Sequence, residues 1–183
     1  WDNAKAANYT VTENLGTLTI TENSAEVTLT AATDSKTYDG KALTNANVTA
    51  SGLPEGFTYE ATASGSQTDA GNSTNVVNDG YKFFDKDGND KTANFTNVKK
   101  VDGTLTVNPK AVTITTGSDS KAYDGTALTK DEASIDGLVE GESVTLAATG
   151  TITEVGSTSN TYSITWDNAK AANYTVTENL GTL

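Results

Sequence analysis

The sequence predicts a mainly β protein made of two tandem small β modules, sandwich or β-grasp-like, arranged end to end with at most short helical turns. Short segments that alternate apolar and polar residues, rich in Val, Ile, Leu and Thr, recur along the chain, and this is the pattern of half-buried strands. No segment carries the long apolar stripe of period 3.6 that a packed helix needs. An eleven-residue motif also occurs twice, which indicates two modules rather than one.

The repetition sets the expected domain boundaries. Residues 34–44 recur as residues 119–129 with nine of eleven positions identical, so Tyr38 and Tyr123 lie 85 residues apart. Residues 166–183 also reproduce residues 1–18 without a change, and nested periods are the signature of a tandem array. We therefore expect three parts: the C-terminal strands of a preceding repeat (residues 1–24), a first β module (segment A, residues 25–109) and a second β module with a truncated closing strand (segment B, residues 110–183).

The strands of the first two parts follow from alternation. We expect them at residues 17–21, 27–30, 57–61, 81–84, 94–98 and 103–107. Asp39-Gly40 and residues 52–56 are expected to form turns, because glycine reaches positive φ without steric cost. Residues 43–48 fit either one helical turn or a short strand, and residues 62–76 are expected to hold a weaker strand and a loop.

Segment B repeats this plan. Strands are expected at residues 111–115, 143–147, 151–155 and 162–166, and residues 167–172 are the stretch most compatible with one or two helical turns. Four residues, Asn108-Pro-Lys-Ala111, separate the alternating runs of the two segments. Proline fixes its own φ and restricts the residue before it. The junction is therefore expected to bend little, unlike a Gly/Ser linker.

Composition excludes several functions. The net charge is −12 with only 12 basic residues, which argues against nucleic acid and against anionic membrane surfaces. The chain contains no Cys, Met or His, so disulfides, His-based zinc sites and Ser-His or Cys-His nucleophile pairs are excluded. No apolar run approaches the length of a membrane span. We therefore expect neither enzymatic activity nor a cofactor. Glycoside hydrolysis by a pair of carboxylates is a distant alternative.

One acidic loop is a candidate calcium site. Its possible ligands are Asp85, Asp87, Asn89 and Asp90, and calcium prefers six to eight oxygen ligands. An EF-hand loop, however, has its glycine later and ends on a glutamate, which this loop lacks. The polar hairpin turn is the favoured interpretation, so no metal is expected.

The repeated motif is interpreted as structural. In each copy a tyrosine would cap a small core and Asp-Gly would make a turn; these residues are Tyr38, Asp39 and Gly40, and Tyr123, Asp124 and Gly125. We expect both tyrosines to be buried. The alternative is that Lys36 and Lys121 form Lys–Asn isopeptide cross-links, which requires a buried neighbouring carboxyl with a strongly raised pKa.

These motifs resemble a known family. Lys-x-Tyr-Asp-Gly, the later pairs Asn94-Phe95 and Asn173-Tyr174, and a closing Gly-Thr-Leu-Thr-Val/Ile resemble the YDG/MBG-type repeats of bacterial surface proteins and the high-identity repeats of Gram-positive adhesin stalks. The resemblance covers essentially the whole chain and implies a mainly β extracellular module in long arrays, between a ligand-binding head and a cell-wall anchor. Two departures are Phe95, where Tyr is usual, and a spacing between Tyr-Asp-Gly and the later pair that is six residues shorter in segment B.

We therefore expect a structural stalk repeat at the bacterial cell surface, projecting a binding domain from the cell. The alternative is a module that itself binds host or microbial glycans or proteins, for which an exposed aromatic pair such as Tyr162 and Trp166 would be needed. The expected partners are neighbouring repeats of the same array, without nucleic acid or membrane insertion. We also expect strand exchange, in which residues 1–21 of one chain complete segment B of another.

Overall fold

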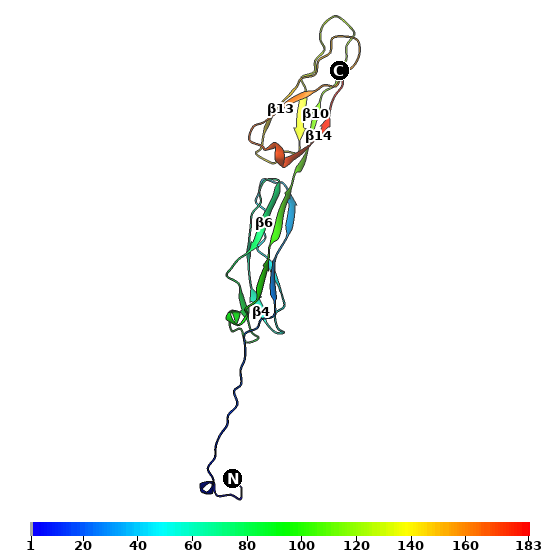
Figure 1. Cartoon of the computed structure of the whole chain (residues 1–183). Coiled ribbons are helices and arrows are strands. Elements are labelled where there is room, and N and C mark those ends of the chain that lie inside the picture. The colour runs from blue at the N-terminus through cyan, green and yellow to red at the C-terminus, as the bar shows by residue number, and fades with distance from the viewer. Residues whose placement is uncertain (1) are drawn as a thin grey trace.

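The computed structural model describes residues 2–183, which contain fourteen β-strands and three 3-10 turns: η1 (Ala6–Asn8), η2 (Thr92–Asn94) and η3 (Ala171–Asn173). The predicted mainly β class is confirmed. Within the described range no helix is long and apolar enough to cross a membrane. Figure 1 shows two groups of strands that follow one another along an elongated molecule, with the N-terminal residues extended away from both.

Segment A forms three small sheets. Its strands are β1 (Val27–Ala31), β2 (Asp34–Thr37), β3 (Val48–Ser51), β4 (Thr58–Glu60), β5 (Ala63–Ser64), β6 (Gly71–Val77), β7 (Lys82–Phe84), β8 (Val98–Val101) and β9 (Gly103–Asn108). The sheet orders are β3-β1-β8, β2-β9-β6-β5 and β4-β7. Strand β1 is antiparallel to β3 and parallel to β8, and its alternate residues are buried, because successive strand side chains point to opposite faces.

Segment B repeats part of this topology. Its strands are β10 (Lys110–Thr116), β11 (Ala133–Asp136), β12 (Val144–Ala148), β13 (Tyr162–Trp166) and β14 (Tyr174–Asn179), in sheets of order β11-β10-β14 and β12-β13. Strand β10 is antiparallel to β11 and parallel to β14, which matches the relation of β1 to β3 and β8. Each sheet takes its strands from one segment only. The division into modules at residues 24 and 109 stays a prediction.

The two segments share apolar contacts. One buried cluster lies within segment A and includes Val27, Leu29 and Phe83. A second cluster combines residues of both segments: Tyr38, Leu43, Leu105, Val107, Val112, Ala169 and Tyr174. Only Pro109 separates β9 from β10, so one strand leads directly into the next beside this second cluster.

Each segment has a buried asparagine at the same position of the repeat, and its side chain joins two backbone carbonyls. Asn75 is fully buried and its Nδ2 donates to the carbonyls of Ala32 and Asn45 at 2.9 and 2.8 Å. Asn160, 85 residues later, is also fully buried and donates to the carbonyls of Gly117 and Lys130 at 2.9 and 2.8 Å. A buried amide needs such partners to offset its desolvation. Neither asparagine belongs to a motif that predicts a buried role, although their spacing equals the repeat offset.

Several predicted strands differ from the structure. Residues 17–21 form no strand, and the side chains of Leu18 and Ile20 are fully exposed. Residues 151–155 contribute only an isolated bridge at Ile152. The predicted helical stretch 167–172 is reduced to η3, and strands β2 and β11 were not predicted. Alternation alone does not make a strand: backbone N–H and C=O groups need a neighbouring strand, and residues 17–21 have none.

Candidate functional site

The repeated motif forms the same turn in both segments. In the first copy, Lys36 Nζ donates to Asp39 Oδ1 and to the Lys41 carbonyl, both at 2.5 Å. Asp39 Oδ1 also accepts the Lys41 N–H at 2.9 Å, and Gly40 has the positive φ of 76° that Asp-Gly predicts. The Lys36 hydrogen bond is the main reason why the pKa of Asp39 lies below its ordinary value.

The second copy reproduces this turn and disfavours the cross-link alternative. Lys121 Nζ donates to Asp124 Oδ1 at 2.8 Å and Gly125 has φ 77°. The Lys121 hydrogen bond, followed by the bond from the Thr126 N–H, holds the pKa of Asp124 well below its usual range. An isopeptide-forming site needs a neighbouring carboxyl with a raised pKa. Asp124 has the opposite shift, and its lysine is engaged in an ordinary ion pair.

The two tyrosines of the motif have different environments, which corrects the prediction that both are buried. Tyr38 is 6% exposed, whereas Tyr123 is 62% exposed. The physical reason is contact between segments: Tyr38 packs against the Tyr174 ring and lies in one buried cluster with residues of segment B. The structure places no such neighbour on Tyr123 within the described residues. The local sequence therefore sets the turn, and the adjoining segment decides the burial.

The contact of Tyr38 with segment B centres on Glu142. The hydroxyls of Tyr38 and Tyr174 donate to the two carboxylate oxygens of Glu142, one to each. The two tyrosine rings meet edge to face with centroids 5.6 Å apart, and Trp166 stacks on Tyr174 at 5.5 Å. Such ring pairs add to the stabilisation from buried area. Tyr174 Oη also accepts the Val139 N–H at 3.0 Å.

These contacts raise the pKa of both tyrosine hydroxyls. Burial, followed by the hydrogen bond to Glu142, raises the pKa of Tyr174 to about 12. The hydrogen bond to Glu142, followed by burial, raises the pKa of Tyr38. A phenolate beside the Glu142 carboxylate would meet like charge in a poorly solvated place. The contact is therefore built for neutral tyrosines.

A second set of polar contacts lies beside the tyrosines. Asn173 is 1% exposed; its Oδ1 accepts the Ala70 N–H at 2.7 Å and its Nδ2 donates to Asp69 Oδ1 at 2.9 Å. Lys170 Nζ donates to Asp69 Oδ2 at 2.5 Å. Lys170 and then Asn173 lower the pKa of Asp69 through these bonds. Every one of these bonds joins segment A to segment B.

We call the six side chains that make these contacts the junction cluster; they are Tyr38, Asp69, Glu142, Lys170, Asn173 and Tyr174. Only Tyr38, Asn173 and Tyr174 belong to the motifs that the sequence predicts to be structurally important. Asp69 is recoverable from the repeat offset, because an acidic residue, Glu154, stands 85 positions later. Glu142 carries no such signal, since its counterpart at the same offset is Phe57. The cluster supplies orientation rather than reactive chemistry, because its charged groups are paired with each other or with hydroxyls.

The calcium candidate loop is a turn closed by its own first residue. Asp85 Oδ1 accepts the N–H groups of Asp87 and Asn89 at 3.0 and 2.9 Å, and Gly88 has φ 80°. The Asn89 N–H is the first cause of the lowered pKa of Asp85, while Asp90 instead accepts from Thr92. No group of three or more acidic side chains able to hold a metal ion occurs within residues 2–183.

The aromatic pair proposed for sugar binding is engaged elsewhere. Trp166 stacks on the buried Tyr174, and the Tyr162 hydroxyl donates to Glu178 Oε1 at 2.6 Å. Both side chains are half-buried. Asn94 and Phe95, the motif pair of segment A, lie at the end of η2. The Phe95 ring packs edge to face against Phe57, with the ring centroids 5.6 Å apart.

Comparison with known protein families finds one match, which covers most of segment B. Residues 108–180 match the YDG domain family. This region contains Tyr123-Asp124-Gly125 and the Asn173-Tyr174 pair, so these two motifs of segment B fall within a YDG domain. No curated protein matches the chain, and no solved structure matches it.

Proposed function

We propose that this chain is a structural stalk repeat of a bacterial surface adhesin or fibre, and that segments A and B are tandem modules that hold a binding domain away from the cell. The junction cluster is the observation that carries this proposal. A spacer needs modules that keep their relative direction. Here three side chains of segment B, Glu142, Lys170 and Asn173, hydrogen-bond to three groups of segment A, and the Tyr174 ring packs against the Tyr38 ring.

The covalent connection supports the same role. Strand β9 continues into β10 through Pro109 alone, and proline removes one backbone rotation. The junction cluster lies beside this connection, so bending would break the bonds between Asp69 and both Lys170 and Asn173. Two linkages side by side resist bending in a way that a single flexible linker does not.

The composition also suits an exposed spacer. A net charge of −12 over 183 residues keeps neighbouring molecules apart and soluble. The absence of Cys and Met leaves no thiol or thioether to be oxidised outside the cell. We therefore place the chain at the bacterial cell surface, with neighbouring repeats of its own array as its main partners.

Small-angle scattering on chains with increasing numbers of covalently joined copies of residues 19–183 tests this function. A stiff stalk predicts a radius of gyration that grows nearly linearly with copy number. The matched variant carries Asn173→Ala and Lys170→Ala in every copy and should grow more slowly, because the side contact is lost while Pro109 remains. Growth of the parent chain as the square root of copy number would refute the proposal.

Binding measurements separate the alternative function. The same chain is tested against immobilised mucin glycans and host extracellular proteins, because a ligand-binding module would retain them even as a single copy. Saturable binding that is lost on substitution of an exposed aromatic such as Tyr123 would favour the ligand-binding role. A stalk predicts none.

A further inference from the structure

Segment B carries the counterpart of the surface with which segment A holds its neighbour. Counting 85 residues from Tyr38, Leu43, Asp69 and Ala70 leads to Tyr123, Leu128, Glu154 and Val155. The local backbone is also alike, because Leu43 bridges Gln67 and Leu128 bridges Ile152 in the same antiparallel way. Segment B therefore has an acidic side chain, a backbone N–H and a tyrosine at the positions that correspond to those which bind Lys170, Asn173 and Tyr174 at the first junction.

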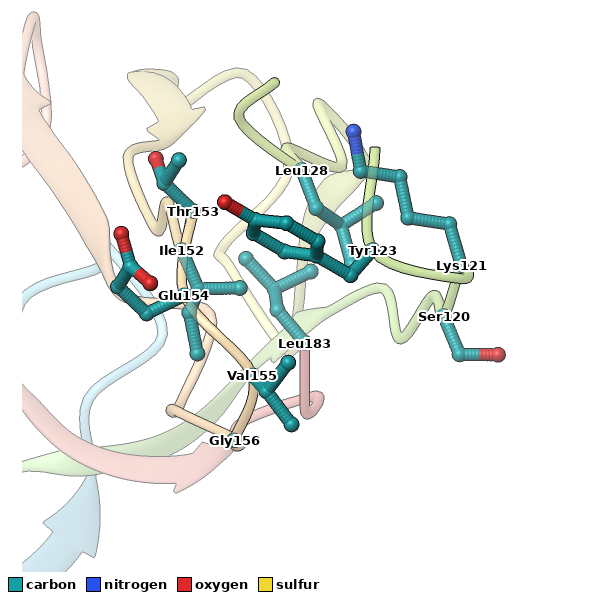
Figure 2. A pocket seen from close by; sticks show the side chains of 10 residues that line it. All are labelled: Ser120, Lys121, Tyr123, Leu128, Ile152, Thr153, Glu154, Val155, Gly156 and Leu183. Carbon is teal, nitrogen blue, oxygen red and sulfur yellow. The ribbon is translucent and has the colours of Figure 1, made fainter. Parts of the chain in front are cut away.

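This second surface is uncovered. Val155 is 86% exposed and Tyr123 is 62% exposed, whereas Ala70 is half-buried and Tyr38 is buried. Figure 2 shows a hollow in which Leu128, Ile152 and Leu183 surround the Tyr123 ring, with Val155 and Glu154 at its margin. Apolar surface gathered around one ring, with an acidic group beside it, is the composition of an interface rather than of ordinary solvated surface.

Segment A carries the counterpart of the opposing surface. The later motif pairs place Asn94 and Phe95 where segment B has Asn173 and Tyr174, and Lys91 where segment B has Lys170. Asn94 ends η2 as Asn173 ends η3, but Asn94 is exposed and Asn173 is buried. A second hollow lies here, lined by Ile20, Thr21, Glu22, Asn23, Pro54, Phe57, Asn94 and Phe95.

We infer that the Tyr123 hollow of segment B is the docking site for residues 19–109 of a second copy of this sequence. Asn94 of that copy would accept the Val155 N–H and donate to Glu154, as Asn173 does with Ala70 and Asp69. The Tyr123 ring would pack on Phe57 and Phe95. The inference rests on the proposed function, because the second copy is the next repeat of the stalk.

Residues 19–21 identify the occupant of the hollow itself. Residues 181–183 are identical to residues 16–18, which continue into Thr19-Ile20-Thr21. In segment A the corresponding strand β9 continues into Val107, which is 1% exposed and packs beside Tyr38, and the Tyr38 N–H donates to the Asn108 carbonyl at 2.8 Å. Ile20 and Thr21 hold the places of Val107 and Asn108. Ile20 is fully exposed in this chain and would enter the Tyr123 hollow.

The two junctions would differ in chemistry. Phe57 stands in place of Glu142 and Phe95 in place of Tyr174, so the carboxylate that binds both tyrosine hydroxyls at the first junction has no counterpart at the second. Val155 is larger than Ala70 and adds apolar area. The second junction would therefore hold more by apolar contact and less by hydrogen bonds than the first. Lys91, which lies 3.6 Å from Asp85, supplies the positive charge opposite Glu154.

Amide hydrogen exchange on the full chain extended after Leu183 by residues 19–109 tests the inference. Relative to the unextended chain, the Tyr123 and Val155 amides should exchange more slowly by about tenfold or more, since both gain a carbonyl or amide partner. Protection of the β1 amides in the added copy verifies that this copy is folded. Unchanged exchange at Tyr123 and Val155 would overturn the inference.

Asn94 offers a matched control. Asn94→Ala in the added copy should remove the protection of Val155, whereas the same substitution in the first copy should leave it intact. Equal effects of the two substitutions would also overturn the inference. Exchange at the Tyr38 amide distinguishes failure of this inference from failure of the proposed function. If Tyr38 stays protected while Tyr123 does not, the contact between segments A and B stands and only the second docking site is refuted. Protection of Tyr123 in the unextended chain by added mucin glycans, without any effect of extension, would assign the hollow to a ligand instead.

Discussion

Replacement of Asn173 by Ala should destabilise segment B and loosen its contact with segment A. The side chain is 1% exposed, accepts the Ala70 N–H at 2.7 Å and donates to Asp69 at 2.9 Å. An N–H left without its partner in a part-buried place costs about 1–3 kcal/mol. Water can reach the half-buried Ala70, so we expect a loss in unfolding free energy of about 2 kcal/mol.

Asn94→Ala is the matched control, because it changes the same motif position in segment A where the side chain is exposed. It should change the unfolding free energy by no more than about 0.5 kcal/mol. Urea unfolding followed by Trp166 fluorescence, with Trp1→Phe in every variant, reports on segment B because Trp166 stacks on Tyr174. The Asp69→Ala change should be non-additive with Asn173→Ala, since the two share a hydrogen bond. Equal losses for Asn173→Ala and Asn94→Ala would refute this account of the junction.

Three further changes test other contacts. The pKa of Tyr174 is raised from 10.0 to about 12, and that of Tyr38 is raised too. The folded state therefore keeps these protons at a higher pH than the unfolded chain does. The unfolding free energy should be constant below pH 10 and fall as the pH rises to about 12. Urea midpoints against pH measure this fall, which should shrink in Tyr174→Phe. Gly181→Ala would place a Cβ 2.2 Å from the Gly117 carbonyl oxygen, whereas a Cβ at Gly16, in the identical sequence, has nothing within 4 Å. Gly181→Ala should therefore lower the melting temperature, and Gly16→Ala should not. Tyr38→Ala should cost about 3–5 kcal/mol, as for other buried aromatics, and Tyr123→Ala less than about 1; equal losses in urea unfolding would contradict the burial difference.

The repeat offset made much of the site accessible from sequence. Alternation predicted the β class, Asp-Gly predicted the two turns, and the offset gave the correspondence of Tyr38 with Tyr123. It did not give Glu142 or Lys170 as partners of segment A. Those contacts join residues about a hundred positions apart, and no local pattern specifies which side chain meets which across such a distance.

Two identical stretches separate the contributions of sequence and tertiary structure. Residues 1–18 and 166–183 have the same sequence, and both form a 3-10 turn over Ala-Ala-Asn, η1 and η3, followed by a tyrosine with φ −130°. This turn is fixed locally. After it, Tyr174 begins strand β14, pairs with β10 and is 7% exposed, whereas Tyr9 lies in no strand and is 60% exposed.

The difference has a simple physical cause. A strand is stabilised only when its N–H and C=O groups meet those of a neighbour and its apolar side chains leave water. Strand β10 offers both to residues 174–179, whereas residues 9–14 lie in no strand. Tyr38 and Tyr123 differ for the same reason: they share a motif and a turn, but only Tyr38 packs against an adjoining segment. The sequence by itself determined the turns and the alternation; the presence of an adjoining strand or segment decided which copy became a strand and which tyrosine was buried.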